Sequence, residues 1–234
     1  MQDILKIIQE RRSVRMPFDP ERPIARQDLR QILEAGRWAP TAHNMQNFEI
    51  VVVDDKKILD EIGEIKSTIS ETFIQENYQQ LSFSEEELLQ KKVGLLGTMF
   101  PPSWRTPGVK PVVEEGRSRS FPVSPTLLVA LYDPGKRAPA SEGDFLGIIS
   151  LGCMMENLWL MANSLGIDFH IVSALGSGPV EKEVKRILAV PDHLKIAFTV
   201  RLGYAAVAPP RYLRVRRDIG GFSHHNHFGK KGID

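Results

Sequence analysis

The chain has 234 residues and a mass of 26.3 kDa, with 42% hydrophobic and 25% charged residues, enough for one or two globular domains with a sizeable core. A net charge of only +1 argues against nucleic acid or an anionic membrane as a partner, and the single cysteine, Cys153, excludes a disulfide framework or a metal-binding cysteine cluster. The first residues lack the basic and apolar regions of a signal peptide, so none is expected, and no apolar run reaches the ~20 residues of a membrane span. We therefore expect a soluble, cytoplasmic protein.

Helical and strand patterns alternate along the first quarter of the chain. Asp3 is a suitable cap for a short amphipathic helix, and a second apolar stripe at helical spacing follows it. The run from Phe48 to Val53 is apolar apart from Glu49, and we interpret it as a strand that is buried on both faces. The predicted elements are helices near residues 4–8, 24–33 and 58–62 and a strand over residues 48–53.

The regular pattern weakens between Glu64 and Arg119. A polar helical stretch around residues 84–92 leads into Phe100 and Trp104, and a mixed-charge stretch follows. An insertion of this kind between regular elements is usually a lid, an excursion or a mobile surface segment.

Regular patterns return at Pro125. The longest helical pattern, over residues 144–166, has so wide an apolar stripe that it needs more than one packing partner, and Gly166 is a natural stop. The basic tail over residues 205–234 is expected to wrap over other parts of the protein. The remaining predicted elements are strands over residues 126–132, 168–174 and 195–204 and a helix over residues 180–188. This alternation suits an α+β fold in which helices flank a mixed sheet.

Four segments carry candidate binding residues. Arg11, Arg12, Ser13 and Arg15 offer guanidinium forks and a hydroxyl suited to a phosphate monoester, although arginines that follow a helix also complement its dipole. A polar loop over residues 40–46 lies between a helix and a strand, where binding residues tend to gather. The other two segments are residues 173–176, which also read as a plain turn, and residues 211–217, where alternate arginines share one side of an extended chain.

A metal site is not predicted. His224, His225 and His227 lie close together, but no carboxylate or cysteine lies at ligand spacing from them.

The motifs at residues 11–15 and 40–46 resemble those of the FMN-dependent nitroreductase family. The resemblance covers about residues 4–65 and 122–220. It implies a nitroreductase-like α+β fold with a central mixed, mostly antiparallel sheet flanked by helices, in an interlocked homodimer with an extended C-terminal tail. The whole chain, residues 1–234, is then one domain with a variable lid over about residues 66–121 and a wrapping arm over about residues 205–234.

The resemblance also implies the cofactor-binding residues. Those expected to hold the FMN phosphate, ribityl chain and pyrimidine edge are Arg11, Arg12, Ser13 and Arg15. Those expected to pack against the flavin of the partner subunit are Pro40, Thr41, Ala42, Asn44 and Gln46, with His43 facing the substrate. Those expected to approach the flavin ring through their backbone are Ser173, Ala174, Leu175 and Gly176. Arg216, with Arg214 as the next choice, is expected to complete the phosphate site.

The implied activity is that of an NAD(P)H-dependent oxidoreductase with no catalytic side chain of its own, because the flavin carries the chemistry. NADH or NADPH would reduce the FMN by hydride transfer and leave, and a nitroaromatic, a quinone or another electron-poor small molecule would then be reduced, which gives ping-pong kinetics. Phe100 or Trp104 are candidate walls for the acceptor. Two alternatives stay open: a flavin-binding protein without turnover, and an enzyme of the same fold that removes halogen or degrades flavin. Neither nucleic acid nor membrane is an expected partner.

Overall fold

The structure, a computed structural model, describes residues 3–68, 82–90, 108, 118–119, 124–139, 143, 145–209, 216 and 218–231. The chain divides into two compact units, one made of Met1–Ser67 and Ser120–Pro209, the other of Thr68–Arg119 and Pro210–Asp234. The first unit holds three of the four predicted binding segments. The assignment of residues 1–234 to one domain with a lid and an arm stays a prediction.

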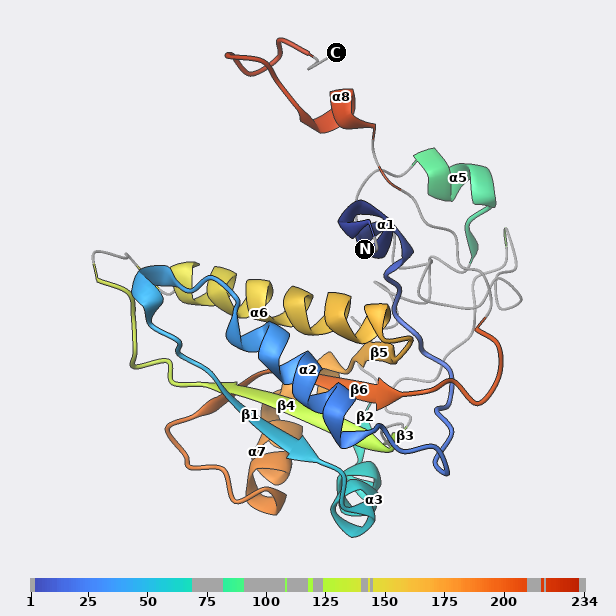
Figure 1. The fold of residues 1–234 in the computed structure, drawn as a ribbon, viewed down its shortest axis with the longest axis vertical. Helices are drawn as coiled ribbons and strands as arrows, with labels where there is room; N and C mark the ends of the chain where they lie inside the picture. The colour runs from blue at the N-terminus through green and yellow to red at the C-terminus, as the bar shows by residue number, and fades with distance from the viewer. Residues whose placement is uncertain are drawn as a thin grey trace. The chain divides into compact units, whose positions relative to one another are not determined.

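A four-stranded sheet in the order β1-β4-β6-β5 forms the centre of the first unit (Figure 1). All of its strand pairs are antiparallel, and the one parallel pairing among the described residues is an isolated bridge between Ser13 and Phe169. The predicted mixed sheet is therefore antiparallel across its four strands. Its strands are β1 (Glu49–Val53), β4 (Thr126–Tyr132), β5 (Asp168–Ile171) and β6 (Lys195–Gly203).

The position of each strand in the sheet explains its burial. The inner strand β4 is buried from Thr126 to Leu131, as its apolar run predicted. In the edge strand β1, by contrast, Glu49 is exposed and only Val53 is fully buried. Ile50 and Val52 nevertheless pack against one core cluster, and Val51 and Val53 against a second one on the opposite face. The prediction that residues 48–53 are buried on both faces is therefore confirmed in part: both faces are covered, but at this edge of the sheet only Val53 is fully buried.

Two pairs of helices cover the two faces of the sheet (Figure 1). One core cluster joins Leu128 and Leu158 under α2 (Arg26–Arg37) and α6 (Phe145–Ser164). The second cluster, with Leu59 and Val184, lies under α3 (Lys56–Glu64) and α7 (Gly178–Ile187). The predicted helices are thereby confirmed, with ends that differ by a few residues.

The long helix α6 is the main support of the first unit. A Cβ atom added at Gly36 of α2 would lie 2.7 Å from Leu158 Cδ2, so the glycine lets the two helices approach closely. The helix ends where Gly166 adopts a φ of +71° and the Ile167 N–H donates to the Ala162 carbonyl over 2.9 Å. By length and mean hydropathy α6 could cross a membrane, but the complete burial of Met154, Leu158 and Ala162 marks it as a core helix.

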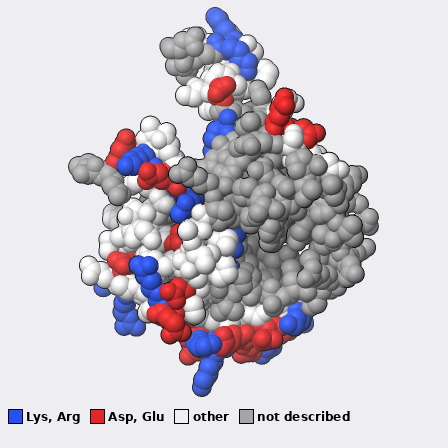
Figure 2. All heavy atoms as spheres, turned by 90° about the vertical axis from the view of Figure 1, so that its right-hand side faces the viewer, with Lys and Arg blue, Asp and Glu red and all other residues white. Residues whose placement is uncertain are grey.

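The remaining helices and strands are short. They are α1 (Ile4–Glu10), η1 (Ala42–Asn44), β2 (Ser67–Thr68), α5 (Glu85–Gln90), β3 (Ser118–Arg119), η5 (Ser173–Gly176) and α8 (Ile219–Phe222), with β2 and β3 paired in a two-stranded sheet. Among the described side chains of the face shown in Figure 2, basic and acidic groups are interspersed, in keeping with the net charge of +1.

Candidate functional site

The segment of residues 11–18, which we call the arginine segment, lies along the edge of the sheet. The Val14 N–H donates to the Phe169 carbonyl over 3.0 Å, and Phe18 forms a bridge with Ala205 just beyond β6. Val14 and Phe18 are buried, whereas Arg12 is exposed and Ser13 is half-buried. Two apolar anchors thus fix the backbone, and the side chains of Arg12 and Ser13, just before them, keep access to solvent.

Trp159 of α6 holds the beginning of the arginine segment. Its indole N–H donates to the Arg12 carbonyl over 3.3 Å, and its ring stacks on Phe169 with a centroid distance of 4.8 Å. The Arg11 guanidinium carbon lies 4.4 Å from the centroid of the Trp159 ring, while Arg11 Nε forms an ion pair of 3.0 Å with Glu156. Arg11 is therefore oriented by a cation–π contact and a carboxylate at once.

Arg201 of β6 holds the end of the arginine segment. Its Nη2 donates to the Met16 carbonyl over 2.9 Å, and its guanidinium carbon lies 4.5 Å from the centroid of the Phe18 ring. The residue is only 1% exposed, and this burial lowers the pKa of Arg201 to about 10. The side chain therefore remains a cation at neutral pH.

His170 faces Arg201 across the β5–β6 ladder, in which the two residues are directly paired. Burial, together with the charges of Arg201 and Arg15, lowers the pKa of His170 to about 3. The imidazole is therefore neutral at physiological pH. The structure thus adds three residues to the site, Trp159, His170 and Arg201, that the sequence analysis did not identify.

The turn at residues 173–176 directly follows β5, the strand to which the arginine segment is bridged through Ser13 and Phe169. The Thr199 hydroxyl donates to the Val172 carbonyl over 2.6 Å, and the Val172 N–H donates to the Thr199 carbonyl over 2.9 Å. The 3-10 turn η5 begins at Ser173, immediately after these bonds. The predicted strand over residues 168–174 is therefore too long by three residues.

The loop over residues 40–46 is held in a strained conformation. His43, Asn44 and Gln46 have φ angles of 52°, 54° and 46°, in the left-handed region that costs most residues about 1 kcal/mol or more. The Ala42 N–H donates to Ser150 Oγ over 3.0 Å, and the Gln46 N–H donates to Thr41 Oγ1 over 3.2 Å. Strain that is maintained in this way is typical of binding loops.

The polar side chains of this loop point away from the core. Pro40, His43, Asn44 and Gln46 are exposed, and the Gln46 side-chain amide donates to Asn44 Oδ1 over 3.0 Å. The loop is thus a rigid, solvent-facing donor and acceptor surface.

The loop and the arginine segment contact different parts of α6. The loop binds Ser150, whereas the arginine segment binds Trp159, nine residues further along the helix. A rise of 1.5 Å per residue separates these two points by about 14 Å along the helix axis. Within one chain, therefore, the arginine segment and the turn at residues 173–176 both adjoin β5, whereas the loop over residues 40–46 contacts a different part of α6.

The family model described as "Nitroreductase family" matches residues 8–204 of this chain. The chain belongs to the nitroreductase family. The match runs from Ile8 in α1 to Tyr204, just after β6, so it includes the helices and strands that position the site.

Individual relatives give more detail. A protein of Archaeoglobus fulgidus named as an NADH dehydrogenase/NAD(P)H nitroreductase is 39% identical over 64 residues, which are 27% of this chain and 36% of that protein. The iodotyrosine deiodinase of Thermotoga neapolitana is 25% identical over 218 residues, 92% of this chain and 95% of that protein. The crystal structure of a Bacteroides fragilis nitroreductase with bound FMN has a TM-score of 0.57 at 23% identity, covering 92% of this chain and 96% of that one.

The structure does not test the predicted role of the C-terminal arginines. Arg214 lies outside the described residues, and so do Phe100 and Trp104. Arg216 is described and exposed, but it belongs to the second unit. The predicted completion of the phosphate site by Arg216 or Arg214 stays a prediction.

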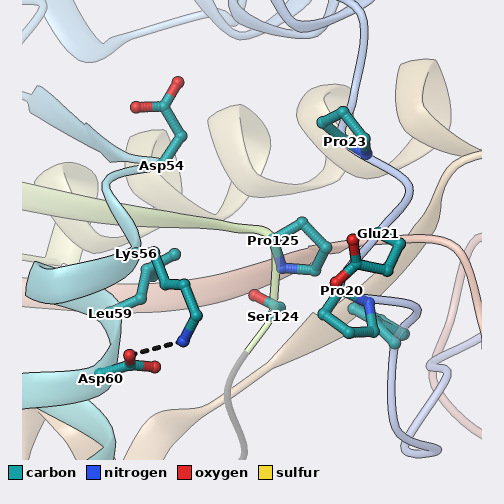
Figure 3. Close-up of a pocket in the computed structure, with 10 residues that line it drawn as sticks. Pro20, Glu21, Pro23, Asp54, Lys56, Leu59, Asp60, Ser124 and Pro125 are labelled. Carbon is teal, nitrogen blue, oxygen red and sulfur yellow. Dashed lines mark hydrogen bonds and ion pairs between the residues drawn. The ribbon is translucent and has the colours of Figure 1, made fainter.

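A cavity of about 230 Å³ lies near Phe18 in the first unit, and its lining is acidic (Figure 3). Three carboxylates, from Glu21, Asp54 and Asp60, line it, and its one lysine, Lys56, is paired with Asp60 at 2.6 Å. This charge opposes the binding of a phosphate. The arginine segment, not this cavity, has the donors that suit an anionic cofactor.

Proposed function

We propose that this chain is an FMN-dependent oxidoreductase that takes electrons from NADH or NADPH and passes them to a nitroaromatic, a quinone or a similar flat, electron-poor acceptor in the cytoplasm. The observation that carries the proposal is the arginine segment, whose backbone is held at Arg12 by Trp159 and at Met16 by Arg201. A segment fixed at both ends presents its arginines at little entropic cost when a ligand binds.

The donors of the site fit FMN. Arg11, Arg12 and Ser13 offer charged forks and a hydroxyl for a phosphate and a ribityl chain. Arg15, beside the half-buried His170, offers positive charge for the pyrimidine edge. When bound, FMN supplies the acceptance and release of electrons. The residues of the chain bind and orient it, and the surplus of positive charge near Arg15 favours the more anionic state of whatever is bound there.

The working form that we propose is a homodimer. Apolar side chains on α1 and the first half of α6 are exposed, among them Ile4 (71%), Phe145 (67%) and Ile148 (61%). A single chain with such a surface is expected to bury it against a partner. A second copy would also supply the loop over residues 40–46, which lies about 14 Å along α6 from the contact point of the arginine segment.

The test is the visible absorption spectrum of the purified protein, before and after anaerobic NADH or NADPH. We expect flavin bands near ~370 and ~450 nm that the nicotinamide bleaches, and that oxygen-free addition of a quinone or a nitroaromatic restores. A colourless protein that takes up no added FMN would contradict the proposal. A protein that keeps its FMN but is never reduced by either nicotinamide would instead be a flavin-binding protein without turnover.

A second candidate activity is reductive dehalogenation, favoured by the alignment of the Thermotoga deiodinase over 92% of this chain. The reduced protein would then release iodide from an iodotyrosine. Measurement of iodide after anaerobic reduction with dithionite separates the two activities, because a nitroreductase without deiodinase activity leaves the carbon–iodine bond intact.

A further inference from the structure

Arg201 is a buried cation whose hydrogen-bonding capacity is largely unused. Its Nη2 donates to the Met16 carbonyl, but its Nε and Nη1 are buried and have no hydrogen-bond partner. Buried guanidinium N–H groups that donate to neither protein nor water are unfavourable, so native structures seldom leave them unpaired. The Phe18 ring covers one face of the guanidinium, which leaves the edges of the plane for a ligand.

The surroundings of Arg201 add donors and positive charge. The Nδ1 atom of His170, the residue paired with Arg201 across the ladder, is also buried without a partner. The charge of Arg15 acts on the same imidazole. Within the described ranges of the chain, no carboxylate forms an ion pair with Arg201. The missing counter-charge must therefore come from outside this group of residues.

We propose that Arg201 and His170 form a buried subsite for an oxyanion, a phosphate or carboxylate group, beside the arginine segment. The guanidinium offers Nε and Nη1, and the neutral imidazole can donate from Nδ1 in the matching tautomer. Because Nη2 of the same guanidinium holds the Met16 carbonyl, an anion bound here also steadies the backbone that carries Arg15. The subsite shares this segment with the proposed FMN site but does not require FMN.

Two sources can supply the oxyanion: the phosphate of FMN, which would make this inference a refinement of the proposed function, or an acidic group of a separate ligand. The reporter for both is the imidazole nitrogen signal of His170 in a long-range ¹H–¹⁵N spectrum, assigned by its loss in His170→Gln. Inorganic phosphate, FMN and riboflavin are the probes, added to the purified full-length protein in chloride buffer.

We expect phosphate or FMN to shift the His170 signal of the wild type and Arg201→Met to weaken that binding by about tenfold or more, because a hydrogen bond to a charged group is lost. Arg37→Met, which alters an exposed arginine of α2, should leave the affinity for phosphate and FMN unchanged. If Arg201→Met does not fold, Arg201→Lys keeps the charge with fewer donors and should show a smaller loss. If FMN shifts the His170 signal, riboflavin does not, and phosphate causes no further shift once FMN is bound, the ligand is the phosphate of the cofactor.

A phosphate effect that persists in the FMN-loaded protein identifies a separate anion. A wild-type His170 signal that moves with neither phosphate nor FMN overturns the subsite. These results are independent of the proposed function, since a protein that binds FMN without moving His170 keeps that function, and one that binds phosphate but no FMN loses it.

Discussion

Replacing Trp159 with phenylalanine tests whether the core of α6 controls the cofactor site. The indole N–H is the group that holds the Arg12 carbonyl, while the ring stacks on Phe169 and lies under Arg11. Phenylalanine keeps an aromatic ring for both ring contacts but cannot donate a hydrogen bond. Trp159→Phe therefore removes the hydrogen bond to the arginine segment while it keeps the stacking on Phe169.

The expected size of the effect follows from the geometry. An N–O distance of 3.3 Å is longer than the usual ~2.9–3.0 Å, which places this bond in the lower half of the range, at about 0.5–1 kcal/mol. If that energy is lost from cofactor binding, the FMN dissociation constant rises about twofold to fivefold. The smaller ring also leaves space in a site that is only 7% exposed, so we expect the free energy of unfolding to fall by about 1–3 kcal/mol.

The assay combines FMN titration, followed by quenching of flavin fluorescence, with urea unfolding of the same preparations. Trp38→Phe is the matched control, because Trp38 is 73% exposed and donates only to Glu34. An FMN affinity unchanged in Trp159→Phe, together with a clear loss of stability, would refute the reasoning and reduce Trp159 to a core residue. An equal loss of affinity in Trp38→Phe would refute it as well.

Three other substitutions test separate parts of the structure. Ile148→Asp should convert a dimer into folded monomers in sedimentation analysis, whereas the exposed Lys57→Asp should not, and an unchanged dimer would exclude this face. Because the pKa of His170 is lowered to about 3 in the folded state, only the unfolded state binds a proton at this residue between about pH 6.5 and pH 3. In phosphate-free buffer, the free energy of unfolding of the wild type should therefore fall by about 2 kcal/mol between pH 6.5 and 5 relative to that of His170→Gln. Urea midpoints that change in parallel in the two proteins would contradict this. Gly36→Ala should lower the free energy of unfolding by about 1–3 kcal/mol through its clash with Leu158, and a stabilised protein in urea would show that α2 can shift.

The sequence predicted best those elements whose pattern depends on the hydrophobic core. The predicted strand over residues 126–132 has the observed bounds, and α6 lies within the predicted residues 144–166. Element ends that depend on a single side-chain hydrogen bond were predicted poorly from the sequence. No periodicity in residues 168–174 reveals that the Thr199 hydroxyl will bond the Val172 carbonyl, where strand pairing gives way to a turn.

The candidate site shows the same division. The arginine segment was visible because three arginines and a serine cluster directly after a predicted helix, but the two side chains that hold it lie in apolar elements. Trp159 is one of many apolar residues in α6. Arg201 was detectable in principle, since it is a lone arginine in the apolar strand between Val200 and Leu202, and a buried charge there requires a partner.

The way each part of the site is held determines how it responds to mutation. The arginine segment depends on Trp159 and Arg201, which belong to the cores of α6 and β6, so a change that loosens either core should also weaken binding at the arginine segment. The loop over residues 40–46 depends instead on Ser150 and on its own strained backbone. Substitutions at the exposed His43 should therefore alter what the loop contacts without altering the arginine segment, because the loop is held through Ser150 and the arginine segment through Trp159 and Arg201. If the proposed function holds, changes in this loop would therefore alter the acceptor while leaving the proposed cofactor site intact.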